Sequence, residues 1–196
     1  SFLKKQGINV NVIPLDIKRN INIFRDLKAL SSLFYLFLKN RPVSVQSITP
    51  KAGLLAMVAA YMARVPLKVH TFTGQVWVTK SGVFRYILKK LDTMIAFFSD
   101  YTIVDGPSQS QFLVEEKVLP LKKSIVFGSG SVSGVDLDTF KPCKKAYADV
   151  RRELSIPEDA FIFVYVGRLN AEKGVLDLAT AFSKIHNDKS YLVLVG

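Results

Sequence analysis

Cysteine and histidine are both scarce in this 196-residue chain. The single cysteine, Cys143, cannot form a disulfide within the chain, so the sequence predicts a protein of a reducing compartment, the cytoplasm. The sequence has no cysteine–histidine cluster with zinc-site spacing and no His-Glu-x-x-His motif. These absences argue against a zinc enzyme and a disulfide-stapled secreted fold, and we expect no metal ion and no cofactor.

Long hydrophobic runs are missing as well. The most apolar stretch covers only residues 52–63, between Lys51 and Arg64. A membrane-spanning helix needs about 20 apolar residues, so this stretch predicts a buried helix. No secretory signal pattern is visible. We therefore expect a protein that is peripheral on the inner face of the cell membrane, with an apolar membrane-facing surface near Phe34, Phe37 and Trp77.

Acidic residues are few relative to basic ones. Lys and Arg number 27 and Asp and Glu 16, which gives a formal net charge of +11. Such an excess favours polyanions: nucleic acid, phosphorylated small molecules or an anionic membrane surface. The alternative is that the basic side chains only keep the surface soluble. The basic residues are scattered and match no nucleic-acid-binding motif, so we expect no nucleic acid, although a basic nucleic-acid-binding module remains an alternative.

Strand-like and helix-like patterns alternate along the chain. Strands are predicted over 8–13, 43–47, 67–72, 101–104 and 125–127; helices over 24–39, from the N-cap Thr49 with Pro50, over 84–98, and from a capping box of Ser108 and Gln111. This order predicts an α/β fold with a Rossmann-like parallel sheet. Ligands of such sheets lie at the carboxyl ends of the strands, which directs attention to 49–53, 70–82 and 106–110.

A second strand–helix–strand unit follows a stretch of small residues at 128–131. The stretch suits a hinge or a close approach of backbone to a ligand. A polar helix is predicted over 144–154, a buried strand over 161–166, a helix over 174–186 and a strand over 191–195. We therefore divide the chain into an N-terminal domain, 1–141, and the incomplete start of a second domain, 142–196.

Two segments hold candidate functional residues. Gly167 to Gly174 joins a predicted strand to a helix, where amide groups, Arg168 and Lys173 could bind a diphosphate. An ordinary turn with a surface Arg and Lys is an equally good interpretation from the residues alone. The second candidate is His70, at the end of a predicted strand, although a lone histidine is more often structural than catalytic.

Three segments together resemble the retaining glycosyltransferases of family four, which have the GT-B architecture of two Rossmann-like domains. They are Thr49-Pro50-Lys51-Ala52-Gly53; Val69 to Lys80; and Ser133 to Asp136, with Phe140 and Pro142, followed by Val166 to Leu169 and Glu172 to Gly174. The resemblance is to bacterial enzymes that build capsule, O-antigen or other lipid-linked glycans. The resemblance covers the whole chain, with the beginning and end of the family pattern missing.

The resemblance implies roles for particular residues. Arg168 and Lys173 would hold the diphosphate of a nucleotide sugar, with UDP as the expected nucleotide, and would make a metal ion unnecessary. His70, Thr73 and Gly74 would lie beneath the reacting sugar, as catalytic-side residues. An acceptor-side group, Thr49, Lys51 and Gly53, would face a lipid-linked glycan.

The sequence also departs from the family pattern. Many relatives carry a histidine where Thr73 stands and another where Gln46 stands. The family's first strand with its Gly-rich loop, and its acidic pair beyond Gly196, are absent, so we expect the chain as given to be inactive. The implied activity is hexosyl or N-acetylhexosaminyl transfer, and a sugar-nucleotide epimerase of the same architecture is the alternative enzyme.

Overall fold

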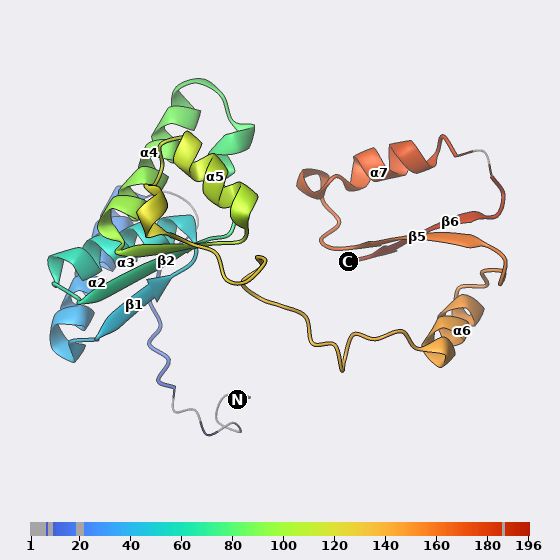
Figure 1. The fold of residues 1–196 in the computed structure, drawn as a ribbon, viewed down its shortest axis with the longest axis horizontal. Coiled ribbons are helices and arrows are strands. Elements are labelled where there is room, and N and C mark those ends of the chain that lie inside the picture. Colours follow the sequence, from blue (N-terminus) through green and yellow to red (C-terminus); the bar gives the residue numbers. More distant parts are fainter. Residues whose placement is uncertain (1–6, 8–9, 19–21, 186) are drawn as a thin grey trace. The chain divides into compact units, whose positions relative to one another are not determined.

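The computed structural model describes residues 7, 10–18, 22–185 and 187–196, except the side chain of Glu172. The chain divides into two compact units, Ser1–Gly134 and Val135–Gly196 (Figure 1). Each unit contains its own parallel sheet. The first unit carries a four-stranded sheet, and the second carries a two-stranded one.

The first unit alternates helices and strands. Its elements are α2 (Ile23–Asn40), β1 (Ser44–Ser47), α3 (Pro50–Met62), β2 (Leu67–Phe72), η1 (Val76–Thr79), α4 (Gly82–Phe98), β3 (Tyr101–Val104), α5 (Pro107–Glu115), η2 (Leu121–Lys123) and β4 (Ser124–Ile125). The sheet has the order β1-β2-β3-β4, with every pair parallel. The helices α3, α4 and α5 lie on one side of it, as right-handed crossovers require (Figure 1).

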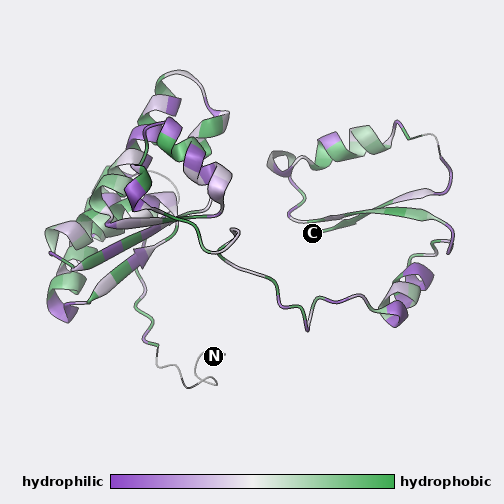
Figure 2. Ribbon diagram, viewed as in Figure 1, coloured by the Kyte–Doolittle hydropathy of each residue, from purple (hydrophilic) through white to green (hydrophobic). Residues whose placement is uncertain are grey.

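Local sequence explains where the helices of this unit begin and end. Asn22 caps α2 by accepting a hydrogen bond from the Arg25 backbone N–H at 3.0 Å. Thr49 is the N-cap residue of α3, and Pro50 follows at its first position, although the threonine side chain makes no capping bond. Helix α3 is apolar around its circumference (Figure 2) because it packs between α2 and α4 and against β1 and β2.

Three helices of this unit are followed by basic residues with left-handed backbone. Arg41 after α2, Arg64 after α3 and Lys117 after α5 have φ values of 45°, 55° and 56°. Positive charge is favourable at the negative end of a helix dipole. Because each helix runs antiparallel to the strands, these residues lie at the amino edge of the sheet, opposite the edge where the strands end.

The second unit contains one strand–helix–strand repeat preceded by a helix. Its elements are α6 (Lys144–Glu153), β5 (Phe161–Val166), η3 (Ala171–Lys173), α7 (Val175–Phe182) and β6 (Ser190–Val195). The guanidinium of Arg151 joins α6 to the segment before β5. It donates to the carbonyls of Pro157 and Ala160, the latter at 2.9 Å, and lies 4.5 Å from the ring of Tyr147.

Most predicted elements are confirmed. The strand predicted over 125–127 is the two-residue β4, Ser124–Ile125, and three other details were wrong. Residues 10–13 form no strand, since nothing in the described chain pairs with them; residues 8 and 9 lie outside the described part. Helix α5 has Gly106 as its N-cap, with Pro107 next, so Ser108 and Gln111 form no capping box. Helix α7 ends at Phe182, short of the predicted end, and residue 186 is not described.

The small-residue stretch at 128–131 packs against the loop after β3. The Ser131 backbone N–H donates to the Asp105 carbonyl at 2.6 Å. A Cβ added at Gly130 would lie 2.7 Å from that carbonyl oxygen, and Gly130 has a φ of 115°. The glycine is therefore required by a close backbone-to-backbone approach within the first unit.

None of the helices in the described part of the chain is both long and apolar enough to span a bilayer. The predicted helix at the most apolar stretch, now α3, instead supplies core residues such as Met57, Ala59 and Ala60, each with 0% exposure. Helix α3 is apolar because α2, α4, β1 and β2 pack around it.

Lys123 provides a test of how the first unit is held together. Its ammonium donates to the carbonyls of Ala96, Phe97 and Ser99 at 2.9, 3.0 and 2.5 Å, at the end of α4. Lys123→Met would leave these acceptors without that donor, and we expect it to lower the free energy of unfolding by about 1–3 kcal/mol. Urea denaturation followed by the fluorescence of Trp77, the only tryptophan, measures this. The neighbouring Lys122→Met, at an exposed position, is the control; equal losses in both variants would contradict the capping role.

Candidate functional site

His70 lies on β2 and is buried, with 1% of its surface exposed. Its Nδ1 is in hydrogen-bond contact with the Ser47 hydroxyl at 2.7 Å, across from it in the parallel pair β1–β2. The ring also packs edge-on against Phe72, with centroids 4.7 Å apart. Burial lowers the pKa of His70 from 6.5 to about 4, so the imidazole is neutral at pH 7.

Gly53 lets α3 approach the His70 ring closely. A Cβ added at Gly53 would lie 2.5 Å from His70 Cε1 and 2.9 Å from Nδ1. Gly53 is itself buried. The structure thus brings together two residues that the sequence analysis assigned to different sides of the site.

Lys51 joins the beginnings of two helices. Its ammonium lies 2.6 Å from the Asp26 carboxylate on α2 and donates to the Lys18 carbonyl at 2.8 Å. The hydrogen bond with Lys51 is the main cause that lowers the pKa of Asp26. Thr49, two residues earlier, is exposed.

Thr73 and Gly74 are exposed in the loop after β2, at the carboxyl edge of the sheet. Gly74 has a φ of 133°, a backbone conformation that favours glycine. The next residue, Gln75, accepts a hydrogen bond from Gln109 Nε2 at 3.4 Å, and Gln109 in turn accepts from the Asp105 backbone N–H at 2.7 Å. The loops after β2 and β3 are therefore connected side by side.

The Gln75 side chain retains an unused donor. Its Nε2 is buried and has no hydrogen-bond partner in the described part of the chain. Sequence reasoning did not single out Gln75 or Gln109, because a single glutamine in a loop or in the first turns of a helix carries no motif. Their positions after β2 and β3 in a parallel sheet were the only available signal.

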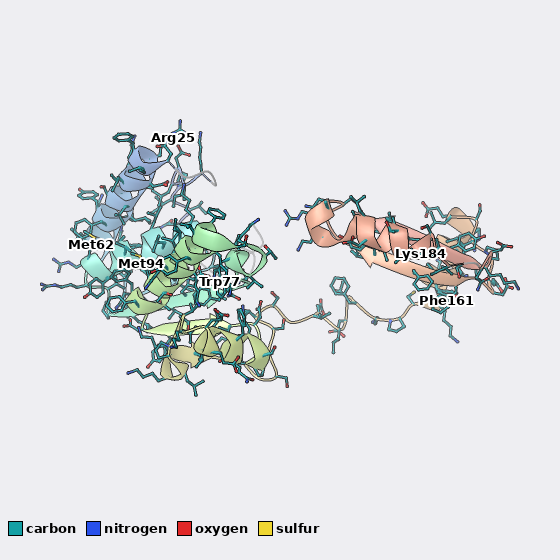
Figure 3. The ribbon with its side chains drawn as sticks, turned by 90° about the horizontal axis from the view of Figure 1, so that it is seen from above. Arg25, Met62, Trp77, Met94, Phe161 and Lys184 are labelled. Atoms are coloured by element: carbon teal, nitrogen blue, oxygen red, sulfur yellow. The ribbon has the colours of Figure 1, made fainter. Side chains whose placement is uncertain are left out.

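Trp77 holds the loop after β2 against α4. It is 1% exposed, and its Nε1 donates to the Asp92 carboxylate on α4 at 2.8 Å. Phe112 stacks on the indole with centroids 5.5 Å apart, and Arg85 lies 5.0 Å from its centroid. Figure 3 labels Trp77 within this unit. Our expectation that Trp77 contributes to an apolar membrane-facing surface was therefore wrong, since the indole is enclosed by protein.

Asp92 is 6% exposed and sits in a mostly apolar environment. Burial raises its pKa from 3.8 to about 6, and the hydrogen bond from Trp77 opposes this in part. Sequence analysis did not identify Asp92, which lies within a helix and matches no catalytic pattern.

An apolar pocket of about 360 Å³ lies between α3, η1 and α4. We call it the α3–α4 pocket. It is lined by Asp26, Pro50, Lys51, Leu54, Leu55, Val76, Trp77, Leu88, Leu91 and Asp92. The pocket thus joins the start of α3, which follows β1, to the turn η1, which follows β2. Of the predicted acceptor-side residues, Lys51 lies in its wall, whereas Gly53 faces His70.

The loop Gly167 to Gly174 in the second unit presents two exposed cations. Arg168 and Lys173 are both exposed, and neither forms an ion pair with any residue that the structure describes. The Tyr165 hydroxyl donates to the Arg168 carbonyl at 3.1 Å, and Asn170 Oδ1 accepts from the Lys173 backbone N–H at 3.1 Å. These bonds fix the loop backbone while leaving both cationic groups available to an anion.

Asp136 begins a turn, in which its backbone carbonyl accepts from the Phe140 N–H at 2.8 Å. Its carboxylate accepts from the Asp138 backbone N–H at 3.0 Å and from the Thr139 hydroxyl at 2.6 Å, and these bonds lower its pKa. Within the described ranges, no group of three or more His, Cys, Asp or Glu residues could hold a metal ion.

No protein-family model matches the chain. Its sequence is 28% identical over 214 residues to the capsular polysaccharide biosynthesis glycosyltransferase CapM of Staphylococcus aureus, a match that covers 100% of this chain and 56% of the relative. It is 30% identical over 184 residues to the UDP-Gal:alpha-D-GlcNAc-diphosphoundecaprenol alpha-1,3-galactosyltransferase of Escherichia coli, covering 91% of this chain and 46% of the relative. The chain therefore spans about half the length of these curated relatives. The predicted resemblance to glycosyltransferases of bacterial capsule and lipid-linked glycan synthesis is confirmed.

Solved structures show the fold. The Anabaena protein Alr3699/HepE, crystallised with UDP-glucose, superposes with a TM-score of 0.71 at 15% identity, over 98% of this chain and 48% of that one. A UDP-GlcNAc 2-epimerase from Neisseria meningitidis gives 0.54 at 15% identity, over 99% of this chain and 60% of that one. The predicted α/β fold of GT-B type is confirmed. Because the epimerase shares it, fold alone does not separate the two enzyme classes.

The Gly53–His70 contact predicts a specific sensitivity. Gly53→Ala would place a methyl group against the buried imidazole, and we expect a loss of about 1–3 kcal/mol in the free energy of unfolding. Gly106→Ala is a control that lacks this clash, because a Cβ there meets nothing within 4 Å; as the N-cap residue of α5, Gly106 should show only the small cost of alanine at a cap. Urea denaturation monitored through Trp77 compares the two. Equal stability of the Gly53→Ala variant and the parent would show that α3 can shift without cost.

Asp92 predicts a pH-dependent effect on stability. Its pKa is raised from 3.8 to about 6 on folding, so its stabilising contribution is complete below pH 3.8 and is lost as the pH rises through 6. Asp92→Asn keeps an acceptor for Trp77 but cannot ionise. The variant should therefore gain stability relative to the parent as the pH rises from 4 to 7, by on the order of 2 kcal/mol.

His70 has the opposite slope, because its lowered pKa makes its contribution disappear as the pH falls from 6.5 through about 4. His70 is present in the parent and in the Asp92→Asn variant, so its contribution cancels in the difference between their free energies of unfolding. Denaturation curves at half-unit pH steps measure that difference. A difference that does not change with pH would refute the burial of an ionisable carboxyl at Asp92.

Proposed function

We propose that this chain is part of a retaining glycosyltransferase, which moves a sugar from a nucleotide-diphosphate donor to a lipid-linked glycan in the synthesis of a bacterial surface polysaccharide. The observation that carries the proposal is the similarity to two bacterial glycosyltransferases over at least 91% of this chain. The name of the Escherichia coli relative specifies a UDP-sugar donor and a diphosphoundecaprenol-linked acceptor. A UDP-linked donor and a lipid-linked acceptor are accordingly the substrates we propose here.

The second unit is proposed to begin the donor-binding domain. As the sugar leaves, negative charge grows on the nucleotide diphosphate, and fixed cations stabilise that charge in the transition state. Arg168 and Lys173 are exposed on one loop, whose backbone is held by Asn170 and Tyr165. Their two charges support the role of this loop as the diphosphate site, and with them the reaction would need no metal ion.

The first unit is proposed to be the acceptor side. Thr73 and Gly74 are exposed at the carboxyl edge of its sheet, where ligands of such sheets bind. We propose that the reacting sugar lies over this loop. His70 is buried and neutral, so we assign it the role of a positioning residue that supports the loop and the start of α3. Gly53 permits this arrangement by its contact with the imidazole.

We further propose that the intact protein is peripheral on the inner face of the cell membrane and contacts anionic lipid. Phe34 and Phe37, our first candidates, are half-buried, and Trp77 is buried. Helix α4 is a better candidate, because Val83, Phe84, Ile87, Met94 and Phe97 on it are all exposed. Its one acidic residue, Asp92, is buried, whereas Lys90 is exposed, which suits an anionic surface.

The alternatives have less support. A sugar-nucleotide epimerase shares the fold, but the sequence matches are to glycosyltransferases. A nucleic-acid-binding module is suggested only by the net charge of +11. Nucleic acid is therefore not among the partners we propose.

The two cations of the second unit give the direct test. In the full-length protein, Arg168→Ala and Lys173→Ala should each reduce sugar transfer by roughly 100- to 1,000-fold, because each removes a preorganised charge from the departing diphosphate. Lys173→Arg should restore only part of the rate, since a planar guanidinium and a compact ammonium place their donors differently. The measurement is transfer of a labelled sugar from a UDP-sugar to a lipid-linked acceptor.

Lys184→Ala is the matched control, because Lys184 is also an exposed lysine of the second unit but lies beyond α7 (Figure 3). Circular dichroism checks that every variant is folded. If both loop variants are folded and transfer sugar within a few-fold of the parent, the loop does not bind the donor diphosphate.

A further inference from the structure

We infer that the α3–α4 pocket holds the first part of the acceptor's hydrocarbon chain, next to its diphosphate; this inference rests on the proposed function and deepens it. The sequence predicted a lipid-linked acceptor but did not identify this pocket or any site for the acceptor's hydrocarbon chain. The inference depends on what lines the pocket, where it lies and which surface it adjoins.

Most of the pocket wall is hydrocarbon. Seven of its ten lining residues are apolar: Pro50, Val76, Trp77, Leu54 and Leu55 of α3, and Leu88 and Leu91 of α4. A sugar would lose hydrogen bonds to water in such a place and regain few of them, at a cost for each unpaired group. A hydrocarbon chain would gain free energy from the apolar area removed from water.

The polar groups of the wall already contact one another. Asp26 is paired with Lys51 at 2.6 Å, and Asp92 accepts from Trp77 at 2.8 Å. A ligand that seeks hydrogen bonds would have to displace these internal contacts. This chemistry selects an apolar occupant over a carbohydrate or a nucleoside.

The pocket lies where the acceptor is proposed to bind. Pro50 and Lys51 follow β1, and Val76 and Trp77 follow β2 just after the exposed Thr73 and Gly74. Its volume of about 360 Å³ corresponds to roughly a dozen groups of the size of a water molecule. A short length of chain fits such a space, whereas a complete long-chain lipid would continue outside it.

Helix α4 joins the pocket to an apolar outer surface. Leu88 and Leu91 line the pocket, while Phe84, Ile87 and Met94 lie one turn away on the same helix and are 53%, 48% and 43% exposed. Because the only acid of α4 is buried, a chain could pass from a bilayer along α4 to the pocket beside hydrocarbon and Lys90. This continuity favours a membrane lipid as the source of the chain.

Trp77 reports on the pocket directly, since it lines the pocket and is the only tryptophan of the chain. We expect farnesyl diphosphate, below its micellar concentration, to change the Trp77 emission in a saturable manner, whereas inorganic pyrophosphate should not. Dodecyl phosphate is the third probe. If farnesyl diphosphate binds and dodecyl phosphate does not, the pocket takes an isoprenoid chain. If farnesyl diphosphate and dodecyl phosphate both bind, the pocket takes hydrocarbon of either kind. No saturable change with either chain, or an equal change with pyrophosphate, overturns the inference.

Pocket-filling variants locate the binding. Leu55→Phe and Leu91→Phe each add volume inside the pocket, and each should weaken farnesyl diphosphate binding by about tenfold, as expected from excluding about two methylene groups. Met94→Phe adds the same ring on the exposed side of α4 and should bind within twofold of the parent. Unfolding in urea confirms that the variants are folded. Parent-like affinity in both pocket variants places the chain elsewhere and overturns the inference.

Kinetics of the full-length protein separate this inference from the proposed function. The acceptor in this assay is a glycan linked to farnesyl diphosphate. Leu55→Phe and Leu91→Phe should raise the KM for this acceptor and leave the KM for the nucleotide sugar unchanged. Transfer with an unchanged acceptor KM would refute the pocket assignment alone. Absence of transfer in the parent, together with pocket binding of farnesyl diphosphate, would refute the transferase function and leave a lipid-binding pocket.

Discussion

The hydrogen bond between Trp77 and Asp92 is the interaction on which the arrangement of the first unit's site depends. It holds the turn after β2 against α4, in surroundings where an unpaired indole N–H or carboxylate would be costly. Phe112 from α5 and the cations of Arg85 and Lys89 complete the enclosure of the ring, and Glu116 pairs with both cations. The anchored indole also forms part of one wall of the pocket, and it lies in the turn η1 that follows the exposed Thr73 and Gly74.

The fold could be predicted from sequence because its determinants are local and periodic. Strands such as Phe161–Val166 are continuous apolar runs, and Thr49 with Pro50 marks a helix start that the structure reproduces. The prediction was wrong at residues 10–13, where an alternating pattern is present but no partner in the described chain completes a ladder. It was also wrong at Ser108 and Gln111, where Pro107 already occupies the first helical position.

The site was predicted less completely, and for a different reason. A motif marks residues near a ligand but does not say which way each side chain points. Lys51 was selected by its position, yet only the structure shows it paired with Asp26 across two helices, and Gly53 proves to accommodate an imidazole. Asp92 and the leucines of the pocket lie within α3 and α4. The sequence pattern of these helices is that of ordinary helices packed in a core. Only the packing of α3 beside α4 distinguishes a lined cavity from a filled core.

The basic residues that follow α2, α3 and α5 have a consequence for how the protein's electric field is distributed. Arg41, Arg64 and Lys117 lie at the amino edge of the sheet, on the far side from Thr73 and Gly74. Lys123 is engaged by backbone carbonyls at the end of α4. These four cations are thus held away from the edge of the first unit's sheet where the acceptor is proposed to bind. Selection among anions at that edge therefore depends on short-range contacts more than on these four charges.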